Sequence, residues 1–314
     1  MPNRVVVTGG AGFIGSNLVI RLVELGYDVT VLDNLSTGKL DNLAAVSGRV
    51  RVVQGDIRDE KAVRAVMDRV DVVFHQAALP SVPRSIVAPV ESNAVNVDGT
   101  LNVLAAARDA GVRRVVYASS SSVYGDAPEL PKREEMAGVP RSPYAVSKLA
   151  AELYCRVFTH VYGLETVSLR YFNVYGPRQN PDSEYAAVVP RFIRALLHGD
   201  PTEIYGDGEQ TRSFTFVTDV VDANLKAAAA RNVAGEAFNI AGTERTSLNE
   251  LNRQIRELVG ADLSSAPRHA EERTSDIKHS YADLAKAKRL LGYAPRVGLA
   301  EGLQATVQWV REQV

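Results

Sequence analysis

Hydrophobic and polar residues follow two alternating patterns along the first half of the chain. Short runs of β-branched residues, at 5–7, 29–32, 50–53, 70–74 and 115–117, are typical of strands. The longer stretches between them have apolar residues at helical spacing. Because strands that alternate with helices form βαβ units, the pattern predicts an α/β fold with a doubly wound parallel sheet.

Glycines mark the ends of two predicted helices. The helical patterns at 14–25 and 94–110 are followed by Gly26 and Gly111, and glycine readily adopts the left-handed conformation of a helix C-cap. Beyond residue 171 the pattern loosens into loops rich in Pro, Gly, Asp and Tyr. There we predict further helical segments near 186–198, 248–259, 283–291 and 299–312.

One stretch of the second half resembles the first half. Residues 214–240 again follow a strand, helix, strand pattern, so we expect two interleaved domains. The first is a Rossmann-type dinucleotide-binding domain of residues 1–170 plus about 214–242. The second is a smaller α/β substrate-binding domain of about 171–213 plus 243–314.

Composition narrows the class of protein. A chain of 314 residues that is 46% hydrophobic can bury a large core. Acidic and basic residues nearly cancel, 37 against 36, so no charge excess indicates nucleic acid or a membrane surface as partner. The single cysteine, Cys155, suits a reducing compartment, and the five histidines have no metal-ligand spacing. Without an N-terminal signal pattern or a long apolar run, we expect a cytoplasmic protein without a metal.

A glycine-rich turn follows the first predicted strand. The segment 9–15 reads Gly-Gly-Ala-Gly-Phe-Ile-Gly and opens a helix. Such a turn lets a diphosphate reach backbone amides at the amino end of the helix, where the helix dipole favours negative charge. Asp33 ends the next strand about 20 residues further on, where a carboxylate binds the adenosine ribose and repels a 2′-phosphate. Because Asn34 follows instead of an arginine, we predict NAD as the cofactor.

Tyr144 and Lys148 are the predicted catalytic pair. They lie four residues apart in a helical pattern, so both side chains are expected on one face of a helix. A free tyrosine has a pKa near ~10, but an ammonium one turn away and a nearby nicotinamide cation favour the phenolate, which can act as a base. The predicted strand at 115–117 runs into the serines 119–122, at the strand edge where α/β sheets bind ligands.

The order of these motifs resembles the extended short-chain dehydrogenase/reductase family. The resemblance covers essentially the whole chain, and the subgroup it matches best is the UDP-hexose 4-epimerases, especially those that accept UDP-N-acetylglucosamine. It implies that Ser120 assists the tyrosine, with Ser121 beside it. The implied catalytic residues are Tyr144, Lys148, Ser120 and Ser121.

The resemblance also implies contacts to the cofactor. Residues 75–78 are similar to the loop beside the nicotinamide, Asp56 and Ile57 to the adenine contact, and Asn96 to the asparagine of the family's fourth helix. The implied cofactor-binding residues are Gly9, Gly12, Phe13, Ile14, Gly15, Asp33, Asn34, Ser36, Gly38, Asp56, Ile57, Gln76, Ala77, Ala78, Asn96, Tyr144 and Lys148.

A second set of motifs implies a UDP-sugar substrate. Asn173, within 170–177, corresponds to an asparagine that contacts UDP, and Tyr205 to an aromatic residue that stacks on uracil. Arg212 and Arg273 correspond to diphosphate-binding arginines, whose guanidinium groups suit phosphate oxygens. The implied substrate-binding residues are Ser81, Arg84, Ser121, Ser122, Tyr144, Asn173, Val189, Tyr205, Arg212, Arg273, Asp276 and Ser280.

The family contains several reactions that begin with the same oxidation at C4. Related dehydratases and decarboxylases usually have an acidic residue beside the serine-strand hydroxyl, where this chain has Ser121 and Ser122, so epimerisation is favoured. A nonenzymatic NAD-binding regulator is the alternative of another class, but such relatives tend to lose the tyrosine or the lysine. Both are kept in this chain.

Sugar specificity and assembly are further implications of the resemblance. The position of Ser280 gates the sugar pocket in the epimerases, and a small residue there leaves room for an N-acetyl group. Arginines could instead pair with a C6 carboxylate, which keeps UDP-glucuronate as the alternative substrate; they are Arg84, Arg178, Arg191 and Arg194. The long helical patterns at 94–110 and 144–162 resemble the helices that form a homodimer in this family.

Overall fold

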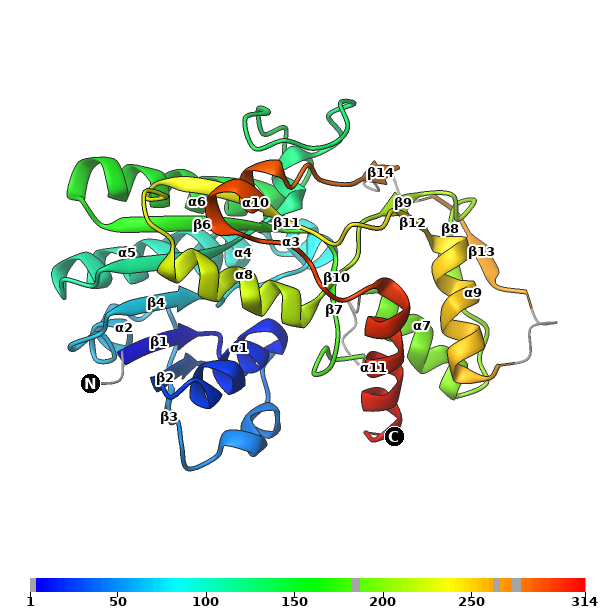
Figure 1. Ribbon diagram of the computed structural model, residues 1–314, viewed down its shortest axis with the longest axis horizontal. Helices are drawn as coiled ribbons and strands as arrows, with labels where there is room; N and C mark the ends of the chain where they lie inside the picture. Colours follow the sequence, from blue (N-terminus) through cyan, green and yellow to red (C-terminus); the bar gives the residue numbers. More distant parts are fainter. Residues whose placement is uncertain (1–3, 182–186, 262–265, 273–277, 314) are drawn as a thin grey trace.

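The computed structural model describes residues 4–181, 187–261, 266–272 and 278–313. Among these residues, seven strands form one sheet in which every pairing is parallel (Figure 1). In spatial order they are β11 (Glu236–Ile240), β6 (Glu165–Tyr171), β5 (Arg114–Ser120), β4 (Val72–His75), β1 (Arg4–Thr8), β2 (Asp28–Asp33) and β3 (Arg51–Gln54). The predicted α/β fold with a doubly wound parallel sheet is confirmed.

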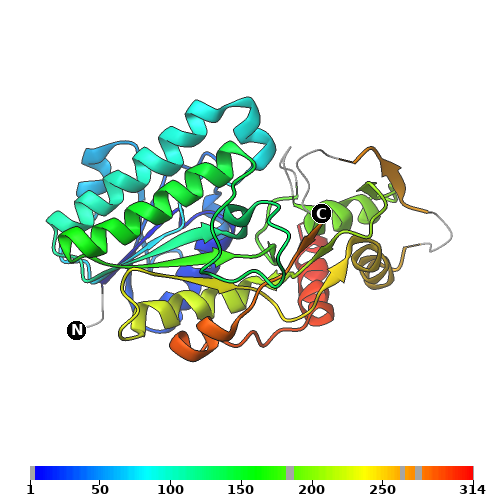
Figure 2. The ribbon, with the colours of Figure 1, turned by 90° about the horizontal axis from the view of Figure 1, so that it is seen from above.

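Two helical layers cover this sheet. On one face lie α1 (Phe13–Glu24), α8 (Val217–Ala229), α10 (Ala285–Leu291) and the 3-10 segment η1 (Leu40–Val46). On the other face lie α2 (Glu60–Arg64), α5 (Gly99–Asp109) and α6 (Pro143–Tyr162). Figure 2 shows α5 and α6 side by side on one face, with α8 and α10 on the opposite face. Each layer has its own buried apolar cluster against the sheet, as two-sided burial requires.

Shorter elements connect the strands near the ends that carry the site. They are α3 (Val82–Val87), α4 (Pro89–Asn93), the π-helical turn η2 (Ala94–Asp98) and the 3-10 turn η3 (Ser121–Tyr124). The helix predicted at 94–110 is therefore not uniform, because its first turn is π-helical and its α-helical part begins at Gly99. A π turn inserts an extra residue and often lies at a functional site.

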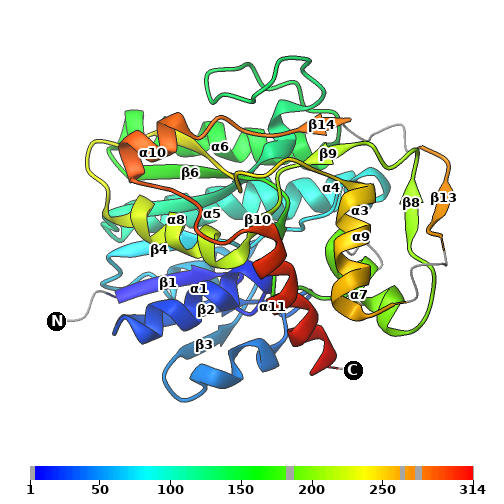
Figure 3. The same ribbon diagram turned by 45° about the vertical axis from the view of Figure 1, so that its right-hand side comes forward.

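A smaller region lies beyond one end of the sheet. Its helices are α7 (Val188–Leu197), α9 (Leu248–Val259) and α11 (Leu299–Arg311), which share one apolar core (Figure 3). Its strands are short and form separate small sheets: β7 (Val174–Tyr175) with β10 (Thr215–Phe216), β8 (Glu203–Tyr205) with β13 (Arg268–Ala270), and β9 (Thr211–Arg212) with β12 (Thr246–Ser247) and β14 (His279–Ser280).

The stretch 214–240 contributes to both regions. Its last strand, β11, pairs with β6 at the edge of the main sheet, whereas its first, β10, pairs with β7 outside that sheet. Phe216 of β10 packs on Tyr175 of β7 in the core of the smaller region, which explains why β10 does not extend the main sheet. Within the described ranges, no helix is long and apolar enough to cross a membrane.

The register of the sheet brings the predicted motifs to one edge. Thr8, the last residue of β1, pairs with Leu32 of β2 and with His75 of β4. Ser120, the last residue of β5, pairs with Tyr171 of β6. Since all these strands are parallel, the glycine turn, Asp33, the loop after His75 and the serines leave the sheet on the same side.

Candidate active site

The glycine turn packs so tightly that side chains would not fit. A Cβ at Gly15 would lie 2.0 Å from the carbonyl oxygen of Gly9, and a Cβ at Gly9 would lie 2.7 Å from the backbone of Ala77. Gly12 is the N-cap of α1 and provides no side-chain cap, so the first backbone N–H groups of the helix face the turn. This cradle fits the diphosphate of a dinucleotide, because N–H groups and the helix dipole both favour an anion.

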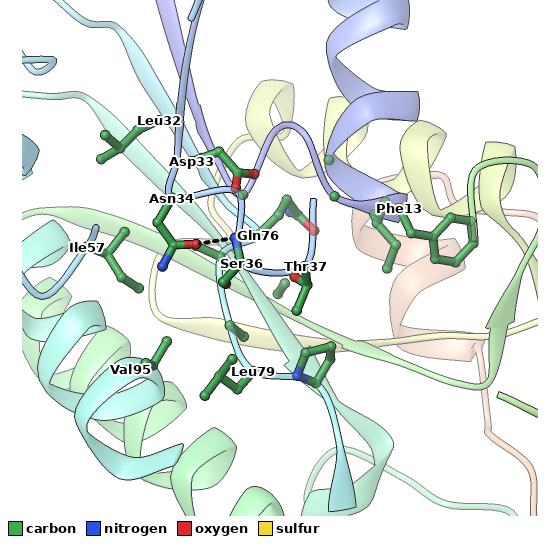
Figure 4. A pocket seen from close by; sticks show the side chains of 18 of the residues that line it. Phe13, Leu32, Asp33, Asn34, Ser36, Thr37, Ile57, Gln76, Leu79 and Val95 are labelled. Atoms are coloured by element: carbon green, nitrogen blue, oxygen red, sulfur yellow. Dashed lines mark hydrogen bonds between the residues drawn. The ribbon is translucent and has the colours of Figure 1, made fainter. Parts of the chain in front are cut away.

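A pocket extends from this turn to the Tyr144 and Lys148 side chains. In Figure 4, Asp33, Asn34 and Ser36 lie close together, with Ile57 to one side of them and Leu79 and Val95 below. Asp33 is held by the N–H groups of Ala11 (2.9 Å) and Leu35 (2.8 Å), which fix its carboxylate at the end of β2. An acidic group at this position fits the ribose hydroxyls of NAD.

Most predicted cofactor residues line this one pocket, and so does Arg84, which was expected at the substrate. The predicted residues found there are Gly9, Gly12, Phe13, Ile14, Gly15, Asp33, Asn34, Ser36, Ile57, Gln76, Ala77, Ala78, Arg84, Tyr144 and Lys148. Three predicted residues lie behind its wall. Gly38 packs against the backbone of Ala11, Asp56 accepts a hydrogen bond from Asn34 (2.8 Å), and the buried Asn96 bonds Leu79 and Ser147.

Several residues of the same wall were not predicted from the sequence. They are Leu32, Thr37, Gly55, Arg58, Leu79, Pro80, Glu91, Val95, Ala118, Ser119 and Tyr171. Leu79 and Arg58 could have been predicted from the sequence. Each directly follows a residue that was already predicted to contact the cofactor, Ala78 and Ile57 respectively. No sequence pattern indicated Val95 or Tyr171, since only the packing of η2 and β6 brings them to the pocket.

The predicted catalytic pair lies at the inner end of the pocket. Helix α6 begins at Pro143 with Ser142 as N-cap, whose hydroxyl accepts the N–H of Ala145 (3.2 Å). Tyr144 and Lys148 follow on one face of the first turns, and Lys148 donates to the carbonyl of Ala118 (2.9 Å). The ammonium lies 5.1 Å from the ring centre of Tyr117 and 6.0 Å from that of Tyr144.

Burial governs the ionisation of this pair. Burial lowers the pKa of Lys148 to about 7. Burial raises the pKa of Tyr144, while a hydrogen bond with the Ser120 hydroxyl acts in the opposite direction. Without a bound cofactor, burial thus governs the pKa of Tyr144, and the expectation that Lys148 together with a nicotinamide cation favours the phenolate stays a prediction. Formation of the phenolate depends on Ser120 and on positive charge added at the pocket.

The serines of the strand end have separate partners. Ser120 caps η3 and accepts hydrogen bonds from the backbone N–H of Ser122 (3.2 Å) and its hydroxyl (2.9 Å). Ser119 donates to Glu152 of α6 (2.5 Å). Ser120 is therefore the serine that the structure brings to Tyr144, while Ser121 begins η3 beside it.

His75 supports the pocket from inside the sheet. Its ring nitrogens bond the hydroxyls of Thr8 (2.7 Å) and Thr100 (2.9 Å), and Thr100 donates to the carbonyl of Asn96. Burial lowers the pKa of His75 to about 3, with the charge of Lys148 as the second cause. The imidazole is thus neutral at physiological pH and links β1, β4 and η2.

Three of the predicted substrate residues lie near strand ends: Asn173 after β6 of the main sheet, and Arg212 and Ser280 in the short strands β9 and β14. Asn173 follows β6 with φ of 37°, a left-handed conformation that asparagine tolerates, and donates to the carbonyl of Ser213 (3.0 Å). Arg212 of β9 pairs with Ser280 of β14, which is buried. The pairing between strands distant in sequence thus brings the predicted diphosphate contact and the predicted gating residue together.

The other predicted substrate residues have different surroundings. Tyr205 ends β8, with the Arg191 guanidinium 5.3 Å from its ring centre. Ser81 caps α3 by accepting the N–H of Arg84 (3.1 Å), and Val189 is buried in the core of the smaller region. Arg273 and Asp276 lie outside the described residues. In the part of the chain that is described, no group of three His, Cys, Asp or Glu residues could hold a metal ion.

Comparison with known proteins defines the family. The chain belongs to the NAD dependent epimerase/dehydratase family, whose model matches residues 5–241. A UDP-glucose 4-epimerase from Mycolicibacterium smegmatis is 43% identical, and the match covers 99% of each chain. A UDP-N-acetyl-alpha-D-glucosaminuronate decarboxylase from Bacillus cytotoxicus is 37% identical, again over 99% of each. The family resemblance inferred from the motifs is confirmed, and the chain is an enzyme of this family.

Solved structures agree in fold. The UDP-N-acetylglucosamine 4-epimerase from Methanobrevibacter ruminantium, in complex with UDP-N-acetylmuramic acid, has a TM-score of 0.95 at 39% identity and covers 100% of both chains. The UDP-glucose 4-epimerase from Thermus thermophilus, in complex with NAD, has a TM-score of 0.89 at 38% identity, covering 99% of this chain and 100% of that one. NAD as the cofactor agrees with the family description and with the glycine cradle.

Proposed function

We propose that the chain is a nucleotide-sugar 4-epimerase that inverts C4 of a UDP-hexose, either the UDP-N-acetylglucosamine/UDP-N-acetylgalactosamine pair, the UDP-glucose/UDP-galactose pair, or both. The observation that carries this proposal is the inner end of the pocket. Tyr144 and Lys148 line the pocket there, Ser120 hydrogen-bonds Tyr144, and the neighbouring positions where diverting relatives have an acid are Ser121 and Ser122.

Different residues of the site have different roles in the reaction. Tyr144 takes the proton of the 4-hydroxyl as a general base, and Ser120 donates a hydrogen bond to the same oxygen as it becomes a carbonyl. When bound, NAD would supply the hydride acceptor for C4 and the hydride donor for the opposite face of the keto sugar. Lys148 holds the ribose side of the cofactor and supplies positive charge near Tyr144. Between the two half-reactions the 4-keto sugar turns about its link to the diphosphate.

The two ends of the substrate have separate proposed contacts. Arg212 and Asn173 bind the UDP portion, and Tyr205 stacks on uracil, with Arg191 fixing its ring from one side. Ser280 gates the sugar pocket, where its small side chain leaves room for an N-acetyl group. Arg273 keeps its predicted role at the diphosphate, and Asp276 its predicted polar contact to the nucleotide or sugar region.

UDP-glucuronate is the second candidate substrate, favoured by the arginines that could pair with a C6 carboxylate. All four of these arginines already interact with other residues of the protein. Arg84 pairs with Glu91 (3.3 Å), Arg178 donates to Asn17 (2.9 Å), and Arg191 covers the Tyr205 ring. Because these side chains already have contacts, they support a substrate whose sugar has no C6 carboxylate.

We further infer a homodimer formed through α5 and α6. Helix α6 exposes an apolar stripe in which Val146, Leu153, Val157 and Val161 are each about half exposed. Contiguous exposed apolar residues of this kind commonly mark a protein interface. Leu153→Glu is expected to convert the dimer to a monomer in sedimentation velocity at micromolar concentration. A wild-type protein that sediments as a monomer would exclude this assembly.

The reaction itself can be followed by NMR. Purified protein is incubated separately with UDP-N-acetylglucosamine, UDP-glucose and UDP-glucuronate, without added reductant, and the anomeric and C4 proton signals are recorded. We expect conversion to the C4 epimer, with the N-acetyl compound preferred. Tyr144→Phe is expected to lower the rate by about 10³-fold without loss of thermal stability.

Other products would change the assignment. A dehydrated or decarboxylated sugar would show that the intermediate is diverted, and the epimerase proposal would then be wrong. No conversion of any of the three compounds would favour another nucleotide sugar or a nonenzymatic NAD-binding role.

A further inference from the structure

A buried ion pair lies directly behind the catalytic serines. Glu152 of α6 and Arg170 of β6 approach to 2.6 Å, and their side chains are only 9% and 8% exposed. A second contact, from the Arg170 Nε to the carboxylate, measures 3.1 Å. Neither residue lines the pocket, so the pair does not bind cofactor or substrate. Buried charges are costly to desolvate, and a pair that adds little stability can serve to fix one arrangement of the core.

Each end of this ion pair bonds one hydroxyl. On the side of the site, the Ser119 hydroxyl donates to Glu152 (2.5 Å). On the far side, Arg170 donates to the Tyr124 hydroxyl (2.7 Å), which in turn donates to Asn239 of β11 (2.6 Å). The cluster thereby connects α6 with the ends of β5, β6 and β11.

The end of β5 is consequently held to α6 at two successive residues. Lys148 bonds the carbonyl of Ala118, and Glu152 bonds the side chain of Ser119. Ser119 and Ser120 share a peptide bond, so a Ser119 side chain fixed to α6 limits the movement of the Ser120 backbone relative to that helix. Ser120 is the residue that bonds Tyr144.

We propose that the Glu152–Arg170 pair is a positioning unit for the catalytic hydroxyls: it holds Ser119, and thereby keeps Ser120 within hydrogen-bond reach of Tyr144. This inference rests on the proposed function for the reaction that it serves. Glu152 and Arg170 lie outside the pocket and act on the reaction only through their neighbours, and Ser119 connects them to Ser120 from the pocket wall.

The chain offers a matched pair of variants for the test. Glu152→Gln leaves the Arg170 charge buried without its carboxylate and can prevent folding, so it is not the main variant. Ser119→Ala removes the hydroxyl that connects the ion pair to the site. Tyr124→Phe removes the hydroxyl on the other side of the same ion pair. Each variant deletes one buried hydroxyl that bonds the ion pair, but only the first loses the connection to Ser120.

Two measurements separate positioning from stability. The first is kcat and KM for the nucleotide sugar beside the thermal unfolding midpoint. The second is the ionisation of Tyr144 without substrate, obtained from the ultraviolet titration of the NAD-bound protein minus that of the same protein with Tyr144→Phe. Other titratable groups that act on Tyr144 and Lys148 are the same in both variants: His75 of β4, Tyr117 of β5 and Cys155 of α6.

Ser119→Ala is expected to lower kcat about tenfold with KM changed less than about twofold, and to raise the pKa of Tyr144 by about one unit. Tyr124→Phe is expected to lower the unfolding midpoint about as much as Ser119→Ala does, and to leave kcat and the pKa of Tyr144 unchanged. Equal effects of the two variants on kcat, or a Tyr144 pKa that Ser119→Ala does not move, would overturn the proposal. If the wild-type protein converts no nucleotide sugar, the proposed function fails, and the titration still decides the role of Ser119.

Discussion

The cofactor side and the nucleotide-sugar side of the protein are built in different ways. On the cofactor side, turns that follow consecutive parallel strands place their residues along one pocket. On the other side, Asn173, Arg212 and Ser280 come from strand ends far apart in the sequence, and only short pairings hold them. The first arrangement is determined largely by local backbone geometry, and the second by long-range packing. Substitutions should therefore affect the two sides differently.

The largest effect is expected in the glycine turn. In Gly15→Ala, the new Cβ would lie 2.0 Å from the Gly9 oxygen, so the turn must move away from α1. We expect NAD affinity to fall more than about 100-fold and the free energy of unfolding to fall by about 3 kcal/mol. Calorimetric titration with NAD and urea unfolding measure the two effects.

Gly26→Ala is the control for the glycine turn. Gly26 has φ of +81° but no atom within 4 Å of its Cβ position, so only backbone strain of about 1 kcal/mol is expected, with normal NAD affinity. NAD binding by Gly15→Ala that equals that of Gly26→Ala would show that the turn does not hold the diphosphate.

The contrast between the two sides also explains what the sequence could predict. The glycine turn, Asp33 and the Tyr144–Lys148 pair could be predicted from the sequence, because a few neighbouring residues determine their geometry. The main strands and the helix ends at Gly26 and Gly111 could be predicted for the same reason. β10 was harder, since its pairing with β7 depends on packing in another region.

The environment of the motifs was less predictable than the motifs. The sequence suggested that Lys148 and a nicotinamide cation lower the pKa of Tyr144, but it gave no sign of the burial that raises this pKa, because only the fold determines burial. Likewise, the four serines at 119–122 look alike in the sequence. Their different partners, Glu152 for Ser119 and Tyr144 for Ser120, both belong to α6 and follow from the packing of the strand end against that helix.

A smaller effect is expected from pH on the cofactor side. The folded-state pKa of His75 is about 3, below the value of about 6.5 for the unfolded chain. Its contribution to stability is therefore complete above pH 6.5 and is lost as pH falls from 6.5 toward 3, because the unfolded chain then binds the proton more readily. Between pH 7 and 5 this loss is about 2 kcal/mol, measurable by urea unfolding.

His75→Asn isolates this contribution from that of the acidic residues. The variant is less stable at pH 7, since it loses the bonds to Thr8 and Thr100, but it should lose about 2 kcal/mol less than the wild type between pH 7 and 5. His160→Asn, at an exposed position, should follow the wild type. A His75→Asn curve parallel to that of the wild type would contradict the buried neutral imidazole.

The smallest effect on the fold, and the sharpest on specificity, is expected on the sugar side. Ser280 ends the short strand β14, opposite Arg212 of β9. In Ser280→Tyr, a phenol in the proposed gating position would fill the room for an N-acetyl group. We expect the ratio of kcat/KM for UDP-N-acetylglucosamine to that for UDP-glucose to fall about tenfold, which is the usual scale for steric exclusion in a binding pocket.

Ser280→Ala is the matched control, because it removes the hydroxyl without adding volume. If Ser280 acts by size, the alanine variant keeps the wild-type ratio and only the tyrosine variant changes it. If the hydroxyl itself recognises the sugar, both variants change the ratio. NAD binding should be unaffected in both, since Ser280 does not line the cofactor pocket. If the tyrosine variant keeps the wild-type ratio, the sugar binds away from Ser280. The pairing of β9 with β14 would then not determine specificity.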